Sequence, residues 1–321
     1  MHVFENSDYY CIPDYISIKL DLLKWLVYLF MIVSGFSMCC GYYERIMKGN
    51  ISLTEFYSRR YRKLLPFFCF LVIIDCIYSF SRYALLESIA DITLVFSLLP
   101  NPNISIIGVG WFIGIVFLFY MLFPFFCYTI KNRKSAWLAM IISIFYNIAS
   151  YCYFFDDNHV ISSYKSHTNI LFCSMFFYAG GIIYLYRKTI INIFKKYFRY
   201  GILLVGAITV VAVLFLYKIT EIYLPFVCLF VFSTWIIYAI SYDSKLLINK
   251  FTNIISNNSL EIYLSHMLLY RIFEKTKLLY LFGYGVLSLI IITILSIIGS
   301  LILSVLFKKT EKIVLREIIP N

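Results

Sequence analysis

Nine runs of mostly apolar residues, each about the length of a bilayer-crossing helix, dominate this sequence. A transmembrane helix needs about 20 predominantly apolar residues, and helices and closed barrels alone satisfy their backbone polar groups within lipid. The sequence therefore predicts an all-α, polytopic membrane bundle with about nine transmembrane helices. The runs cover residues 25–43, 64–82, 110–130, 135–154, 169–186, 200–217, 223–241, 258–274 and 279–307.

Composition supports this fold class. Of 321 residues, 62% are hydrophobic and 14% are charged, whereas an ordinary soluble domain carries about 25% charged residues. We expect residues 1–321 to form a single membrane-embedded domain. A shorter apolar run at 89–99 ends at Pro100 and is too short to cross the bilayer, so it is interpreted as a re-entrant or interfacial segment.

The distribution of basic residues predicts the orientation of the bundle. If loop 44–63 is cytoplasmic, 20 of the 28 Lys and Arg residues fall on the same side of the membrane. The positive-inside rule favours that orientation. It places residues 1–24 outside the cytoplasm and residues 308–321 inside, as a short basic tail. Topology thus accounts for the net charge of +11, and no nucleic-acid partner is expected.

Cysteine and most histidine residues show no pattern that suggests a metal site. Most of the nine Cys lie inside apolar runs, and no pair has the spacing of metal ligands. His159 and His167 share an expected outer loop with Asp156 and Asp157, which is interpreted as solvated. No metal is therefore expected.

The first candidate site is a cation cluster at the cytoplasmic entrance of run 64–82. It contains Arg59, Arg60, Arg62 and Lys63, of which Arg60 and Lys63 share a helix face. Such a cluster suits a polyanionic ligand, because Arg side chains and helix N-termini bind phosphate. The competing interpretation is a topology signal that contacts lipid phosphates.

A second candidate is a polar stripe in run 258–274. Ser259, Tyr263 and His266 follow one another at helical spacing. Polar groups in a membrane helix face the interior, where they either serve function or hydrogen-bond neighbouring helices. Asp75 within run 64–82 must be paired, protonated or next to water. Trp111, at the outer start of run 110–130, suits an interface anchor.

Several of these segments together resemble the acyltransferase-3 family of bacterial membrane O-acyltransferases. They occur in order, and the resemblance extends from about residue 25 to the end of the chain. The segments are Val33-Ser34-Gly35-Phe36, Arg59-Arg60-Tyr61-Arg62-Lys63-Leu64-Leu65-Pro66, Trp111-Phe112-Ile113-Gly114 with Phe119-Tyr120 and Phe123-Pro124, and Ser259 with Tyr263-Leu264 and His266.

The resemblance implies a ten-helix enzyme that takes an acyl group, usually acetyl, from cytoplasmic acyl-CoA. Such an enzyme passes this group to a hydroxyl of a cell-envelope polysaccharide or lipid-linked sugar. The resemblance also implies a location in the bacterial cytoplasmic membrane. Arg60 and Lys63, with Arg59 or Arg62, would hold the phosphates of coenzyme A. Lys63 stands where the family has a second Arg.

The remaining implied roles concern the acyl path and the catalytic base. Trp111, Ser259, Tyr263 and Asp75 would line the path or brace it, and His266 is a candidate catalytic residue. The family's first helix carries an Arg and a catalytic His. This sequence begins where that helix should end, the Arg has no counterpart, and His2 falls close to the position of the histidine.

Two further departures and two alternatives remain. Val116 and Leu118 stand where many members have Glu and Gln. This departure affects the prediction of the substrate more than the prediction of the fold. The missing first helix is compatible with a start assigned too far downstream, a truncated gene or divergence. The alternatives to an active enzyme are an inactive acyltransferase fragment and a non-catalytic transporter of glycans or polyprenyl-linked sugars.

Overall fold

The computed structural model describes residues 22–78, 80–94, 96–98, 109–154, 168–197, 201–216, 223–242 and 248–318. All regular structure in these ranges is helical, as predicted, and each of the nine apolar runs coincides with a helix. The longer helices are α3 (Leu26–Met38), α5 (Leu53–Tyr78), α6 (Arg82–Thr93), α7 (Trp111–Thr129), α8 (Arg133–Ala149), α9 (Ile170–Tyr197), α10 (Gly201–Leu216), α11 (Leu224–Ser241), α13 (Ser259–Lys275) and α14 (Val286–Ile318).

Short helical segments complete the chain. A π-helix, η2 (Cys39–Tyr43), continues α3 into α4 (Glu44–Met47), and η4 (Ser150–Phe154) extends α8. Helix α12 (Lys250–Asn257) precedes α13 directly. The residues after Phe307, predicted as a tail, continue α14 as far as Ile318.

Six helical stretches in the described part of the chain are long and apolar enough to cross a membrane. The stretches are Leu22–Met47, Trp111–Thr129, Arg133–Tyr153, Ile170–Tyr197, Leu224–Ser241 and Val286–Ile313. Helix α10 is apolar but shorter, whereas α5 and α13 carry charged residues along their length. These two charged helices provide most of the polar groups described below.

The predicted short run at 89–99 belongs to helix α6, which starts earlier than the run does. Ser81 accepts a hydrogen bond from the Ala84 backbone N–H at 3.0 Å and caps the helix, an arrangement typical of helix N-termini. The helix ends at Leu94, whose φ is 59°, and a 3-10 turn (Phe96–Leu98) follows. Helix α6 packs against α5.

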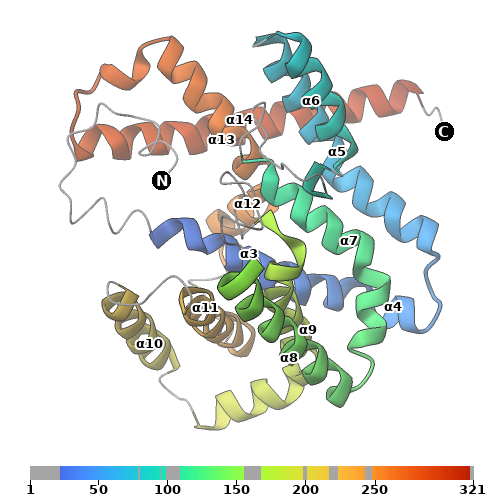
Figure 1. Cartoon of the computed structure of the whole chain (residues 1–321). Helices are drawn as coiled ribbons and strands as arrows, with labels where there is room; N and C mark the ends of the chain where they lie inside the picture. Colours follow the sequence, from blue (N-terminus) through green and yellow to red (C-terminus); the bar gives the residue numbers. More distant parts are fainter. Residues whose placement is uncertain are drawn as a thin grey trace.

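The helices form two groups joined through α3 and α7 (Figure 1). In the lower part of Figure 1, α8 and α11 pack against α9 and α10 packs against α11, and α5, α6, α13 and α14 lie in the upper part. Helix α3 packs mainly against α9, and α7 contacts α3, α5 and α9. The upper group contains the polar residues that the sequence singled out.

Stacked aromatic rings hold the central helices together. Tyr28 of α3 stacks on Phe176 of α9 with ring centroids 4.1 Å apart. Phe119 of α7 stacks on Phe177 of α9 at 4.2 Å. All four side chains are buried, and the most exposed of them, Phe119, has only 6% of its surface accessible. Such pairs contribute about 0.5–1.5 kcal/mol beyond the burial of their area.

Candidate functional site

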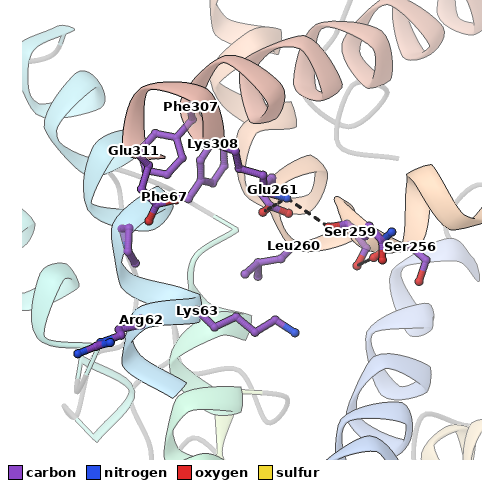
Figure 2. A pocket seen from close by; sticks show the side chains of 12 residues that line it. Arg62, Lys63, Phe67, Ser256, Ser259, Leu260, Glu261, Phe307, Lys308 and Glu311 are labelled. Atoms are coloured by element: carbon purple, nitrogen blue, oxygen red, sulfur yellow. Dashed lines mark hydrogen bonds and ion pairs between the residues drawn. The ribbon is translucent and has the colours of Figure 1, made fainter. Parts of the chain in front are cut away.

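A pocket of about 490 Å³ opens where α5, α13 and α14 meet the end of α12 (Figure 2). Arg62, Lys63, Pro66 and Phe67 line it from α5, and Phe307, Lys308 and Glu311 line it from α14. Ser256 and Asn257 of α12 and Ser259, Leu260 and Glu261 of α13 complete the lining. All of these segments lie at or next to loops that the charge distribution assigns to the cytoplasmic side.

The cations of the pocket differ in their surroundings. Lys308 Nζ lies 2.7 Å from a carboxylate oxygen of Glu261, forming an ion pair within the pocket wall. Arg62 and Lys63 have no acidic partner among the described residues. In Figure 2 these two side chains extend from α5 in opposite directions, and Lys63 extends toward the α13 side. The uncompensated positive charge of the pocket therefore resides on α5, and Glu311 of α14 contributes a carboxylate to the same lining.

Asn258, between α12 and α13, ties this junction to α14. Its side-chain N–H donates to the carbonyl of Ile254 at 2.7 Å. Its side-chain oxygen accepts from Ser304 at 2.9 Å and from Lys308 at 3.0 Å. The aromatic rings of Phe67 and Phe307, with centroids 5.2 Å apart, join α5 to α14 at the same level. These contacts give the pocket defined walls.

The remaining two cations of the predicted cluster lie elsewhere. Arg60 donates to the Tyr42 hydroxyl and to Met38 Sδ at 3.5 Å, and its guanidinium lies 4.5 Å from the centre of the Tyr42 ring. Arg60 is thus held against α3 and η2 inside the bundle. Arg59 pairs with Glu55 at 2.5 Å on the exposed face of α5. The structure therefore brings Arg62 and Lys63, rather than Arg60 and Lys63, to one pocket.

The polar stripe of α13 extends from the pocket into the bundle. Ser259 lines the pocket and donates to the carbonyl of Ser256 at 3.0 Å. The Tyr263 hydroxyl donates to the carbonyl of Val109 at 2.9 Å, two residues before Trp111 starts α7. His266 Nδ1 lies 2.6 Å from the carbonyl oxygen of Tyr263. The polar stripe therefore links α13, which lines the pocket, to the start of α7.

Replacing Tyr263 by Phe tests this link. The change removes the hydroxyl that satisfies the Val109 carbonyl, and an unsatisfied buried acceptor costs about 1–3 kcal/mol. We expect Tyr263→Phe to lower the thermal unfolding midpoint of the purified protein. The control is Tyr128→Phe, at an exposed tyrosine, which should change the midpoint by less than a degree or two. Equal midpoints for the two variants would contradict a bracing role for Tyr263.

Asp75 has a partner that the sequence did not identify. Arg271 Nη1 of α13 donates to both carboxylate oxygens of Asp75, at 2.6 and 2.8 Å. The Asp75 side chain is 3% exposed and the Arg271 side chain is 32% exposed. Lys63 and Asp75 are separated by twelve residues of α5, about 18 Å along the helix axis. The ion pair therefore lies far from the pocket, toward the predicted outer side.

Sequence alone does not indicate several pocket residues. Glu261 lies within the predicted polar segment of α13, but the spacing assigns its charge no role. Lys308 and Glu311 fall in the predicted tail. Residues 308–318 are rich in Lys, Glu and Arg, so no apolar run indicates that α14 continues through them. His2, His159 and His167 lie outside the described residues, so the structure places none of them.

The likeness of this chain to known proteins extends over nearly its whole length. No curated protein and no solved structure matches it significantly. The model of a family described as an acyltransferase domain matches residues 1–309. Together with the apolar helices and the ordered motifs, this match shows that the chain belongs to the acyltransferase-3 family and is a multi-pass membrane acyltransferase.

Proposed function

We propose that this membrane acyltransferase moves an acyl group, most simply acetyl, from cytoplasmic acyl-CoA to a hydroxyl of a cell-envelope polysaccharide. The observation that carries the proposal is the pocket at the predicted cytoplasmic end, where Arg62 and Lys63 have no acidic partner among the described residues. Coenzyme A carries a pyrophosphate and a further phosphate. Uncompensated Arg and Lys side chains in a concave site suit these groups.

The pocket and the inward residues of α13 supply a route for the acyl group. Helices α5 and α13 pack against each other, and Ser259, Tyr263 and His266 follow along α13 from the pocket. The Asp75–Arg271 pair joins the same two helices farther along. We propose that the thioester enters between these helices from the pocket and that the acceptor approaches from the opposite end.

His266 suits the role of base in this scheme. A carbonyl oxygen can only accept a hydrogen bond, so the 2.6 Å contact to Tyr263 assigns the proton of the neutral ring to Nδ1. Nε2 then carries the lone pair that a general base needs. The acceptor hydroxyl would attack the thioester carbonyl while its proton passes to the base. The carbon–sulfur bond then breaks, and the proton leaves with the coenzyme A thiol.

Removing the two uncompensated charges tests donor binding. We expect the double variant Arg62→Gln/Lys63→Gln to raise the KM for acetyl-CoA about tenfold or more, because each charged hydrogen bond to a phosphate contributes about 1.5–3 kcal/mol. The kcat should change little, since the phosphates are remote from the reacting carbonyl. The measurement is coenzyme A release by membrane vesicles from cells that make the polysaccharide.

A matched control separates this effect from membrane topology. Lys131→Gln/Lys134→Gln removes two exposed charges from another loop on the same predicted side, and its KM should equal that of the unchanged protein. If both double variants alter KM equally, the α5 cations act through topology or lipid contact, and the donor-site assignment fails. If the unchanged protein transfers no acyl group to the polysaccharide, the proposed function itself fails.

A further inference from the structure

Helix α6 has the opposite polarity from a helix on a water-soluble protein. Its outward face is apolar, with Tyr83, Leu86 and Ile89 exposed and Tyr83 accessible over 84% of its surface. Its inward face carries Ser88 and Asp91, both buried. This arrangement suits a helix with lipid outside and a polar interior behind it, where intramembrane and interfacial polar residues mark functional sites.

Asp91 is the unusual member of that inward face. It is 0% exposed, and neither carboxylate oxygen has a hydrogen-bond partner in the described part of the chain. Its neighbour Ser88 is satisfied, because its hydroxyl donates to the Ala84 carbonyl at 2.7 Å. Buried polar groups are nearly always hydrogen-bonded, and a buried polar group without a partner costs several kcal/mol. An orphan carboxyl in this position therefore indicates a ligand that supplies donors.

The charges around Asp91 restrict the chemistry of that ligand. Asp75 of α5 and Glu87 of α6 lie within electrostatic range of it. Arg271 of α13 is already bound to Asp75 through both carboxylate oxygens. Burial first, and then repulsion by Glu87 and Asp75, raises the pKa of Asp91 to about 8. An anionic ligand would be repelled here, whereas neutral hydroxyl groups can donate to Asp91.

A metal cation is the other ligand that an acidic group could take. Metal sites need several ligands with convergent geometry. No group of three or more His, Cys, Asp or Glu side chains is placed to hold a metal in the portion of the chain that the structure describes. Neutral hydroxyl donors are therefore the better match to Asp91.

We infer that the inward face of α6, around Asp91 and beside the Asp75–Arg271 pair, binds a polyhydroxylated ligand, namely a sugar unit of the acceptor polysaccharide. The inference rests on the proposed function and adds the acceptor half of the site. Asp91 binds one or two sugar hydroxyls, and the Asp75–Arg271 pair fixes α13 against α5 beside it. Lys63 of the cytoplasmic pocket lies about 18 Å from Asp75 along α5, so the proposed donor and acceptor sites lie near opposite ends of that helix.

Two substitutions of Asp91 and one matched control test the site in the full-length protein. Asp91→Leu removes every hydrogen-bonding atom, Asp91→Asn keeps a neutral donor and acceptor, and Thr93→Ala removes an exposed hydroxyl of the same helix that donates to the Ala90 carbonyl at 2.6 Å. Fragments of the host's own envelope polysaccharide are the probe, and binding is titrated by intrinsic tryptophan fluorescence in a sugar-free detergent. We expect Asp91→Leu to weaken binding at least tenfold, and Asp91→Asn and the Thr93→Ala control to remain within about threefold.

Thermal unfolding distinguishes a ligand site from a structural role. Asp91 ionises near pH 4 in the unfolded chain but at about pH 8 in the folded protein. Its raised pKa therefore lowers folding stability as the pH rises from about 4 to about 8. Both Asp91 variants should unfold at a higher temperature than the unchanged protein, with a larger difference at pH 8 than at pH 5. Variants that instead unfold at lower temperature, with binding lost in proportion, would overturn the inference.

The outcomes for binding and for turnover are separable. Binding of the fragments does not require acyl transfer, so a protein that binds them in an Asp91-dependent manner but releases no coenzyme A would refute the proposed function alone. Failure of the unchanged protein to bind the fragments, or equal binding by Asp91→Leu, would overturn the acceptor site. In that case, retained coenzyme A release that depends on Arg62 and Lys63 would leave the proposed function standing.

Discussion

Replacing Arg271 by Met should be among the most damaging single changes in this protein, with a loss of about 3–5 kcal/mol in the free energy of unfolding. Arg271 donates to both oxygens of Asp75 at 2.6 and 2.8 Å, and Asp75 is 3% exposed. Without the guanidinium, a buried carboxylate loses its hydrogen-bonding partner. The expected result is a large drop in the thermal unfolding midpoint at pH 7, measured in detergent.

A double variant separates the cost of the orphaned charge from the value of the pair. Asp75→Asn/Arg271→Met removes both charges, and we expect it to recover most of the loss, because neutral replacements for a buried ion pair are often tolerated. The control is Lys275→Met on the same helix, whose ammonium lies 4.3 Å from the Tyr78 ring. Such a contact contributes about 0.5–1 kcal/mol at exposed sites.

The results that would contradict this prediction are specific. If Arg271→Met costs no more than Lys275→Met, Asp75 does not depend on the guanidinium. If the double variant is as unstable as the single variant, the damage comes from lost packing of the Arg271 side chain instead of from an unpaired charge. Either outcome would remove the ion pair as the contact that holds α13 to α5.

Gly180→Ala should disrupt the crossing of α3 and α9, with an expected cost of about 3 kcal/mol or more. A Cβ atom at Gly180 would lie 2.3 Å from the Ile32 carbonyl oxygen and 2.6 Å from the Phe36 backbone nitrogen. A Cβ at Gly35 would lie 2.4 Å from the Phe177 carbonyl oxygen. These obstacles are backbone atoms, so no side chain can rotate away, and the two helices would have to separate.

The separation of α3 from α9 should also affect the end of the bundle that carries Arg60 and the neighbouring cations. Arg60 is held by Met38 and Tyr42, which follow Gly35 along the same helical segment. Loss of acyl transfer together with a lower unfolding midpoint is therefore expected for Gly180→Ala. Small residues at such crossings allow close packing of membrane helices, which explains the glycine on each side.

Gly206→Ala on α10 is the matched control, because nothing lies within 4 Å of a Cβ at that position. There the substitution should be neutral or should stabilise the helix by up to about 1 kcal/mol, since Ala is the better helix former. If the unfolding midpoints of Gly180→Ala and Gly206→Ala agree within two degrees, the crossing of α3 and α9 can relax. The close approach of these helices would then not be required for stability.

Locations of the helices followed from the sequence because lipid imposes a simple local requirement. Every backbone polar group must be satisfied within its own segment, so about 20 apolar residues indicate a helix wherever they occur. The nine runs accordingly coincide with helices. The ends of the helices did not follow from hydropathy. Helix α6 begins at Arg82, well before the apolar run at 89–99, because the polar inward face of this helix carries no hydropathy signal.

The candidate site was predicted in its parts but not in its assembly. Helical spacing predicts that Arg60 and Lys63 act together. In the structure Arg60 donates to the Tyr42 hydroxyl of η2, and Lys63 lines the pocket with Arg62. A Lys or Arg side chain at the end of a helix can adopt several orientations, and contacts with residues of other helices determine which one it takes. Local spacing alone does not contain that information.

The contacts between distant residues follow from the packing of the helices. Tyr263 meets Val109 across 154 positions, and Arg271 meets Asp75 across 196 positions. From the sequence alone it follows that Asp75 must be paired, protonated or next to water, because a buried carboxylate is costly in lipid. The sequence does not identify a partner, since pairing depends on which helices pack together. Packing depends in turn on shape, as in the contact of Gly35 and Gly180, and not on the periodicity of either helix alone.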